Sequence, residues 1–178
     1  PNEAIVALQG NVKVKSVDGL EVESDVLHYN QREDVASSDV LVKFTRAALS
    51  GSSIGAILYA KTKTLALMKD AVVINSSPPS QDKSGKHPPV EVRSGRADYF
   101  EHDGIIKFTG ETVVRQGPQV ARADSITGIF KPQTRDVDRI EFRGNSSLRD
   151  EEPGRVSTLY PRFEGRVESF DRAHAGTS

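Results

Sequence analysis

Apolar and polar residues alternate with a period of two along much of this chain. The pattern is clearest in segment 105–116, where Ile106, Phe108 and Val114 occupy even positions and polar residues occupy most odd ones. Successive side chains of a β-strand point to opposite faces, so this alternation predicts a half-buried strand. Gln116-Gly117-Pro118 then predicts a turn into a return strand, which makes the unit a hairpin.

Similar segments follow one another at short intervals, and helical periodicity is weak. The best helical candidate, 53–68, is interrupted by Gly55 and by Thr62-Lys63-Thr64. Asp18-Gly19 and Asp103-Gly104 are dipeptides that two-residue hairpin turns favour, because both central residues of such turns need positive φ. An all-β antiparallel meander is therefore expected, with strands at 4–17, 20–30, 40–49, 55–60, 64–75, 90–100, 105–116, 120–130 and 136–142.

A proline-rich segment at 76–89 interrupts the pattern, with four prolines and no large apolar residue. This composition predicts a loop or linker. We expect one domain over residues 1–150, with two repeat halves at about 4–75 and 90–148 on either side of the loop. Residues 151–178 are expected to form an irregular tail, or an edge strand around Phe163, Val167 and Phe170.

Short sequence motifs recur, which we call phrases. Each begins with a turn residue and continues into a predicted strand. They begin at Gly10, Asp39, Asp70, Gly110 and Gly144. A second phrase alternates with the first and lies at 24–29, 55–59, 97–100 and 123–126. Each repeat is interpreted as a pair of strands. A two-stranded ribbon cannot bury its apolar face alone, so the ribbons must share a core, either as a stack or as two facing sheets.

Composition narrows the class of protein. The chain is 36% hydrophobic and 28% charged with a net charge of −1, which is typical of a soluble globular protein and argues against nucleic-acid binding. The absence of cysteine excludes disulfides and thiolate metal sites. No apolar run reaches the roughly 18 residues of a membrane helix, and Pro1-Asn2-Glu3 does not open a signal peptide. We therefore expect that the chain starts within a longer protein or has been processed.

The repeated phrases resemble those of a known family. Gly110-Glu-Thr-Val-Val-Arg-Gln-Gly117, followed by Ala123-Asp124, is similar to the repeat of the organic-solvent-tolerance A (OstA-like) family, the periplasmic lipopolysaccharide-transport proteins of LptA and LptC type. Gly10-Asn-Val-Lys-Val14 resembles the same repeat, nearer the LptC style. The resemblance covers about residues 4–148. Thr112 and Ser146 depart from it, because the family usually has an apolar residue there.

The resemblance implies a twisted antiparallel β-jelly roll of two sheets, open and V-shaped, built from repeated β-hairpins. It implies a periplasmic protein with no enzymatic activity and no cofactor, whose apolar interior holds the acyl chains of lipopolysaccharide or a similar lipid. Its partners would be other envelope transport proteins of the same fold, or a second copy joined head to tail. The competing hypothesis is a structural or interaction β-repeat module that assembles through sheet edges and binds no lipid.

Candidate binding residues follow from the alternation. The chain has no Trp and only 6% aromatic residues, so slim aliphatic side chains would close the space between sheets about 10 Å apart. The predicted lipid groove comprises Val12, Val14, Val22, Val42, Phe44, Leu65, Leu67, Val72, Ile74, Ile106, Phe108, Val114, Ile140 and Phe142. The opening strand has neither proline nor charge, so the predicted assembly edge comprises Ile5, Val6 and Leu8.

The sequence offers little support for a catalytic site or a metal-binding site. Gly51-Ser52-Ser53-Ile54-Gly55 matches the nucleophile-elbow pattern, but that motif needs a strand, a turn and a helix, so we interpret it as a flexible hairpin turn. The histidines, His28, His87, His102 and His174, are too scattered for a metal site. The carboxylate pairs Asp98 with Glu101 and Asp136 with Asp138 are expected to face water. We therefore predict no catalytic residue and no metal ligand.

Basic residues on the strands have two interpretations. They lie opposite apolar neighbours, so they would form the polar outer face of a sheet. Alternatively, some lie at the mouth of the groove and contact lipid phosphates, for which Arg and Lys are the usual partners. The residues concerned are Lys13, Lys15, Lys43, Arg46, Arg115, Arg122, Arg139 and Arg143.

Overall fold

The computed structural model describes residues 4–76, 88–133, 137–150 and 165–167. This part of the chain is built from strands and turns without a helix, so it holds no helix that could cross a membrane. The strands are β1 (Ile5–Lys15), β2 (Glu21–Asn30), β3 (Val35–Arg46), β4 (Leu49–Tyr59), β5 (Thr64–Asn75), β6 (Val90–Ser94), β7 (Arg96–Phe100), β8 (Ile105–Gln116), β9 (Gln119–Phe130), β10 (Val137–Arg143), β11 (Ser147–Asp150) and β12 (Gly165–Val167).

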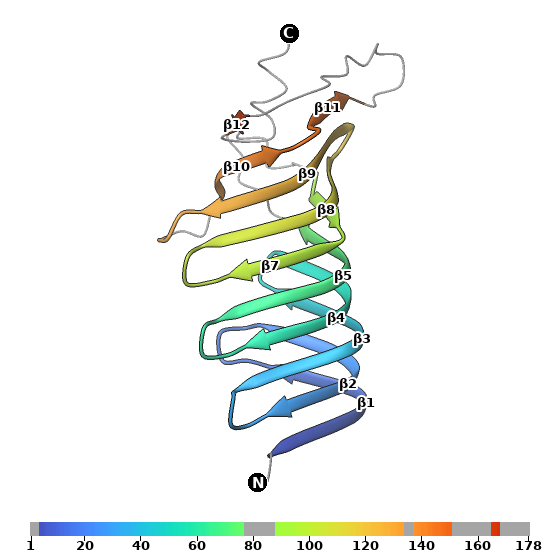
Figure 1. Ribbon diagram of the computed structural model, residues 1–178, viewed down its shortest axis with the longest axis vertical. Helices are drawn as coiled ribbons and strands as arrows, with labels where there is room; N and C mark the ends of the chain where they lie inside the picture. The colour runs from blue at the N-terminus through green and yellow to red at the C-terminus, as the bar shows by residue number, and fades with distance from the viewer. Residues whose placement is uncertain (1–3, 77–87, 134–136, 151–164, 168–178) are drawn as a thin grey trace.

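All pairings are antiparallel and join strands that are close in sequence. The hydrogen-bonded order is β1-β2-β3-β4-β5-β6-β8-β9-β10-β12, with β7 between β5 and β8 and with β11 on β9. Consequently β6 and β7 together occupy one strand position, and β10 and β11 occupy another. The ladder runs from β1 at the bottom of Figure 1 to β10, β11 and β12 at the top.

Each long strand changes direction near its middle. The register shifts at Gln9/Val12, Ser38/Leu41, Ser52/Ile54 and Thr109/Thr112, so bulges interrupt the ladder at corresponding places. Gly10-Asn11, Gly110-Glu111 and Gly144-Asn145 have positive φ at both residues. A bulge of this kind bends a strand sharply. The strands curve along one side of the molecule in Figure 1.

This bend divides the sheet into two facing halves. We call half-sheet I the part that contains residues 5–9, 26–30, 35–38, 55–59, 64–69, 96–100, 105–109, 125–130 and 137–143. Half-sheet II contains residues 12–15, 21–24, 41–46, 49–53, 71–75, 90–94, 112–116, 119–123 and 147–150. The hydrophobic core lies between the two halves, as expected for two sheets packed face to face. The all-β, antiparallel, two-sheet architecture predicted from the sequence is confirmed.

Several details differ from the sequence prediction. The recurring phrases at Gly10, Asp39, Asp70 and Gly110 lie at the bend inside strands and do not start new ones. β3 begins at Val35 and β4 at Leu49, earlier than expected, because Ser and Gly residues at the bend hide the alternation. The predicted linker lies largely outside the described residues.

The two Asp-Gly turns are also longer than predicted. The Gly19 amide donates to the Ser16 carbonyl over 3.1 Å, and the Gly104 amide donates to the Glu101 carbonyl over 3.2 Å. Only the glycine of each pair has positive φ. The aspartates therefore occupy an ordinary turn position, and glycine closes the turn in the left-handed conformation that it adopts at no steric cost.

Candidate functional site: the apolar interior and its mouth

An unbroken row of small and apolar residues crosses the inner face of half-sheet II. Residues directly opposite each other on neighbouring strands share a face of the sheet. The registers place Val14, Val22, Phe44, Gly51, Val73, Val92, Val114, Ala121 and Leu148 in one line from β1 to β11. Most of these side chains belong to the core or pack against it.

Half-sheet I presents two such rows toward the same interior. The row nearer the bend contains Ala56, Leu67, Ala97, Phe108, Ile126 and Phe142, all buried in the core. The second row lies farther from the bend, toward the side where the two half-sheets are not connected, which we call the open side. It contains Leu58, Leu65, Tyr99, Ile106, Gly128 and Ile140. Together with half-sheet II these rows form an elongated interior lined mainly by Val, Ile, Leu and Ala.

Twelve of the fourteen predicted groove residues lie in these inner rows or beside them at the bend. Val72 and Ile74 do not, because their registers place them beside Arg93 and Glu91 on the outer face. Ala71 and Val73 take the inner positions instead and are buried. The register of β5 on β4 shifts between Lys69 and Val72, and Asp70 there has a φ of 49°. A shift of one residue moves every later side chain to the opposite face.

The inner side chains are buried in the middle of the ladder and exposed at its β1 end. Phe108, Val114 and Ile126 are almost fully buried. In contrast, Leu8 is 42% exposed and Val14 is 40% exposed, although their registers with Leu27 and Val22 place them on the inner face. The predicted edge residues Ile5, Val6 and Leu8 lie on β1, which is the first strand of the described ladder and has no neighbour on its outer side. Apolar surface is therefore accessible at this end.

Buried hydroxyl groups line the bend, and sequence reasoning missed them as a group. They are Ser24, Ser38, Ser53, Ser94, Thr112 and Ser146. Ser53 Oγ donates to the Gly55 carbonyl over 2.8 Å, and Ser94 Oγ donates to the Arg96 carbonyl over 2.9 Å. Bulges leave carbonyl groups without ladder partners, and these hydroxyls satisfy them inside the protein. Thr112 is the exception, since its hydroxyl has no hydrogen-bond partner among the described residues.

This row also explains two sequence features. Ser146 Oγ donates to the Gly144 carbonyl over 3.1 Å, which accounts for a polar residue where the family usually has an apolar one. The Gly51 to Gly55 motif lies inside β4 and is not a flexible hairpin, so that interpretation was wrong. Its Ser53 is buried, and the Ser53 hydroxyl donates to the Gly55 carbonyl within the same strand. A strand-turn-helix nucleophile elbow is absent from β4.

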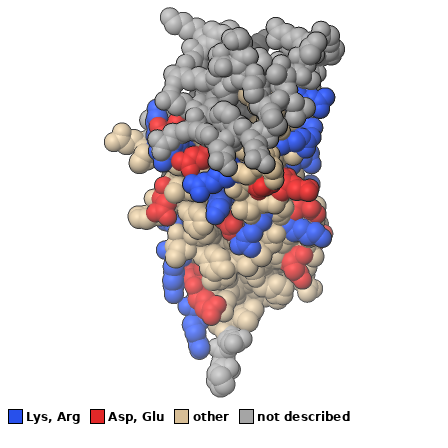
Figure 2. Space-filling model, turned by 45° about the horizontal axis from the view of Figure 1, so that its top comes forward, with Lys and Arg blue, Asp and Glu red and all other residues tan. Residues whose placement is uncertain are grey.

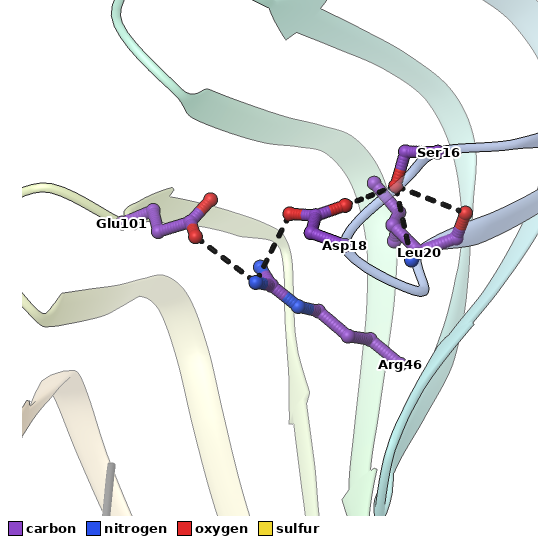
Figure 3. Close-up of polar contacts among 5 residues, drawn as sticks. All are labelled: Ser16, Asp18, Leu20, Arg46 and Glu101. Carbon is purple, nitrogen blue, oxygen red and sulfur yellow. Dashed lines mark hydrogen bonds and ion pairs between the residues drawn. The ribbon is translucent and has the colours of Figure 1, made fainter. Parts of the chain in front are cut away.

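A charged cluster spans the open side of the interior (Figure 3). Arg46, at the end of β3, pairs with Glu101 in the turn after β7, with 3.0 Å between Nη2 and Oε1. The same nitrogen lies 3.1 Å from Oδ2 of Asp18, in the loop between β1 and β2. Arg46 belongs to half-sheet II and Asp18 to a loop that joins two of its strands, whereas Glu101 directly follows a strand of half-sheet I. We call these three residues the mouth triad.

The surroundings favour the ionised forms of Arg46 and Asp18. The hydrogen bond from Arg46 to Glu101 raises the pKa of the guanidinium further above its ordinary range. The Ser16 hydroxyl donates to Asp18 and is the main cause that lowers the pKa of this carboxyl, with a smaller contribution from Arg46. Hydrogen bonds and opposite charges that favour the charged form act in these directions.

The other basic residues named above lie on the outer face. Lys13 and Lys15 pair with Glu23 and Glu21 at 3.0 and 2.7 Å, and both pairs are largely exposed. Arg139 and Arg143 share Glu141. In the face shown in Figure 2, basic and acidic side chains are interleaved over the outer surface. Arg46 is therefore the one member of the predicted basic set that lies at the mouth.

Comparison with known proteins agrees with this architecture. Residues 1–75 match the family described as lipopolysaccharide-assembly, LptC-related. No curated protein gives a significant match. Among solved structures, the chain is similar to LptH from Pseudomonas aeruginosa, described as the LptA homologous periplasmic component of the conserved lipopolysaccharide transport device. The TM-score is 0.54 at 15% identity, and the match covers 84% of this chain and 94% of LptH.

The two matches have different scopes. The family match concerns the sequence of the first five strands and their turns, whereas the structural match concerns the fold of most of the chain. They agree with the resemblance that the repeated phrases at Gly10 and Gly110 predicted. The chain is thus similar to OstA-like proteins of the LptA and LptC type, in sequence over residues 1–75 and in fold over most of its length.

Proposed function

We propose that this protein is a non-catalytic lipid carrier of the periplasm, which holds the acyl chains of lipopolysaccharide or a similar lipid between its half-sheets. The observation that carries the proposal is the aliphatic interior that opens at the β1 end, where Leu8 and Val14 are inner residues and yet are exposed. The LptC-related sequence and the LptA-like fold support it. Aliphatic side chains match flexible acyl chains because both are apolar and neither demands a fixed geometry.

We further propose that the β1 edge docks on an envelope protein of the same fold, or on a second copy, by adding a strand to the ladder. An exposed edge strand presents unpaired N–H and C=O groups, and strand addition satisfies them. Because half-sheets I and II both begin at β1, a partner that continues the ladder would also continue the apolar interior. The protein would then act as one segment of a bridge.

A structural or interaction module remains the second candidate, and one observation favours it. In the middle of the ladder the inner side chains of the two half-sheets bury one another, as in an ordinary filled core. A module of this kind would use the same edge but would hold no lipid.

Native mass spectrometry of protein purified without detergent separates the two candidates. The carrier hypothesis predicts that lipid co-purifies with the unmodified protein and is lost in Val14→Asp. Contact with acyl chains would remove water from the introduced carboxylate, which is energetically costly. Val17→Asp is the matched control, because Val17 lies in the β1–β2 loop and is fully exposed. Protein that carries no lipid, and gains none from lipopolysaccharide or phospholipid vesicles, would favour the module.

A further inference from the structure

The mouth triad joins parts of the chain that the strand ladder does not hold together. Arg46 and Glu101 are 55 residues apart and lie at the free ends of opposite half-sheets. The half-sheets are connected covalently at the bend, on the far side of the interior. A contact across the open side therefore limits how far the two half-sheets can separate.

This pair is also shielded from solvent, unlike the ion pairs on the outer face. The side chains of Arg46 and Glu101 are 13% and 16% exposed. Salt screens such a pair less than an exposed one, and loss of one partner leaves the other charge poorly solvated. The contact can therefore hold the mouth closed at ordinary ionic strength.

Arg46 has a second carboxylate partner, Asp18, on its own side of the mouth. Asp18 holds Arg46 from the β1–β2 loop, which joins two strands of half-sheet II, and the Ser16 hydroxyl donates a hydrogen bond to Asp18. Ser16 is itself fixed by the Leu20 amide, which donates to its Oγ over 3.1 Å. When Glu101 moves away, Arg46 keeps a carboxylate partner. The contact across the mouth can thus break without leaving an unpaired guanidinium, which lowers the cost of opening.

We propose that the contact between Arg46 and Glu101 is a releasable latch that sets the width of the interior and thereby selects which amphiphiles enter. We expect the latch to hinder multi-chain lipids more than single-chain amphiphiles, because several acyl chains side by side need a wider gap between the half-sheets. The selection of lipids rests on the proposed carrier function. The limit on width does not, because it follows from the geometry of the protein alone.

Spin labels measure the width directly, since the native chain contains no cysteine. Ala47→Cys and His102→Cys place labels at exposed positions next to Arg46 and Glu101. We expect a single short distance in the otherwise native protein, and a longer and broader distribution in Arg46→Met and in the milder Glu101→Gln. Lys15→Met, which breaks an exposed pair on the outer face, should leave the distribution unchanged. Identical distributions in all four folded proteins would overturn the latch.

A second measurement tests the selection of ligands. Uptake of a fluorescent two-chain phospholipid from vesicles should be several-fold faster in Glu101→Gln, whereas uptake of a fluorescent fatty acid should not change. Equal acceleration of both probes, or of neither, would contradict the selection. If the native protein takes up no lipid at all, the carrier function fails while the spin-label distances still decide whether the latch exists.

Discussion

The ring of Phe44 lies over the bare Cα of Gly51 on the neighbouring strand. A Cβ placed on Gly51 would approach Phe44 Cε1 to 2.6 Å and the Val72 carbonyl oxygen to 2.3 Å. The aromatic ring thus covers the glycine and fills the space that a side chain would occupy. Gly51→Ala should therefore destabilise the fold by about 1–3 kcal/mol through overpacking. Urea denaturation would measure the change.

Gly95→Ala is the matched control for this substitution. Gly95 lies between β6 and β7, and the nearest atom to an added Cβ is 3.4 Å away, which is an ordinary contact. We expect little change in its denaturation midpoint. If the two variants are equally stable, the close packing of Phe44 on Gly51 is not important for the fold.

The buried hydroxyls at the bend predict opposite effects for two similar substitutions. Ser53→Ala removes a donor to the Gly55 carbonyl and should cost about 1–2 kcal/mol. Thr112→Val removes a hydroxyl that has no hydrogen-bond partner in the described part of the chain and keeps the shape of the side chain, so it should be neutral or stabilising. Thermal melting of both variants checks the pair. A destabilised Thr112→Val protein would indicate that this hydroxyl has a partner after all.

Phe108 and Thr109 test the assignment of inner and outer faces. Phe108 is buried between Ala97 and Ile126, and an unpaired charge there costs several kcal/mol, so Phe108→Asp should unfold the protein or abolish lipid binding. Thr109 is only partly buried and lies opposite Arg96 on the other face, so Thr109→Asp should be tolerated. Circular dichroism and lipid binding should both distinguish the two. Similar behaviour would mean that the faces are assigned wrongly.

Backbone geometry identifies which residues of β1 can serve the proposed docking edge. The Gln31 amide donates to the Ala4 carbonyl, so the alternation of an antiparallel ladder turns the amides of Val6 and Leu8 toward β2 and those of Ile5 and Ala7 outward. Ala7→Pro should therefore weaken association without unfolding β1. Val6→Pro should instead disrupt the pairing of β1 with β2.

Sedimentation across a concentration series, with and without an envelope partner, would measure this difference. An Ala7→Pro protein that associates as well as the native one would exclude strand addition at this edge.

The mouth triad predicts a contribution to stability that depends on pH. The pKa of Asp18 is lowered from its ordinary value of 3.8, so its ionised form stabilises the folded state above that pH. The contribution disappears as pH falls through the lower pKa of the folded protein. We expect Asp18→Asn to melt at a lower temperature than the native protein at pH 7, with the difference shrinking as pH falls below 3.8. A difference that does not shrink as pH falls below 3.8 would mean that the carboxylate is not responsible.

The sequence predicts where two long strands begin and end, but not which face each of their side chains occupies. The bounds expected for 64–75 and 105–116 are those observed for β5 and β8. It fails where a bulge reverses the alternation, because a strand pattern cannot reveal an extra residue that the partner strand accommodates. Val72 and Ile74 were therefore placed on the inner face, and the start of β4 was interpreted as a turn.

Contacts across the interior were also beyond the reach of the sequence. Arg46 looked like seven other strand cations, and Glu101 looked like one of a solvated carboxylate pair. Their meeting depends on how far the two half-sheets fold toward each other, which is set by backbone bulges and not by local composition. The hydroxyl row was missed for the same reason, since its members are spread over five strands and the link between β10 and β11.

The order of strands in the ladder has a consequence for how the protein folds. Each described strand pairs only with strands at most two places away in the chain. Folding can therefore propagate from one strand to the next, as in repeat proteins, and stability is shared between nearest neighbours. The terminal strand β1 has one neighbour and should open more often than the long strands with two, with amide exchange slowing toward β5 and β8. A partner strand that docks on β1 would supply the missing neighbour. Assembly would then be measurable as slower amide exchange in β1 itself.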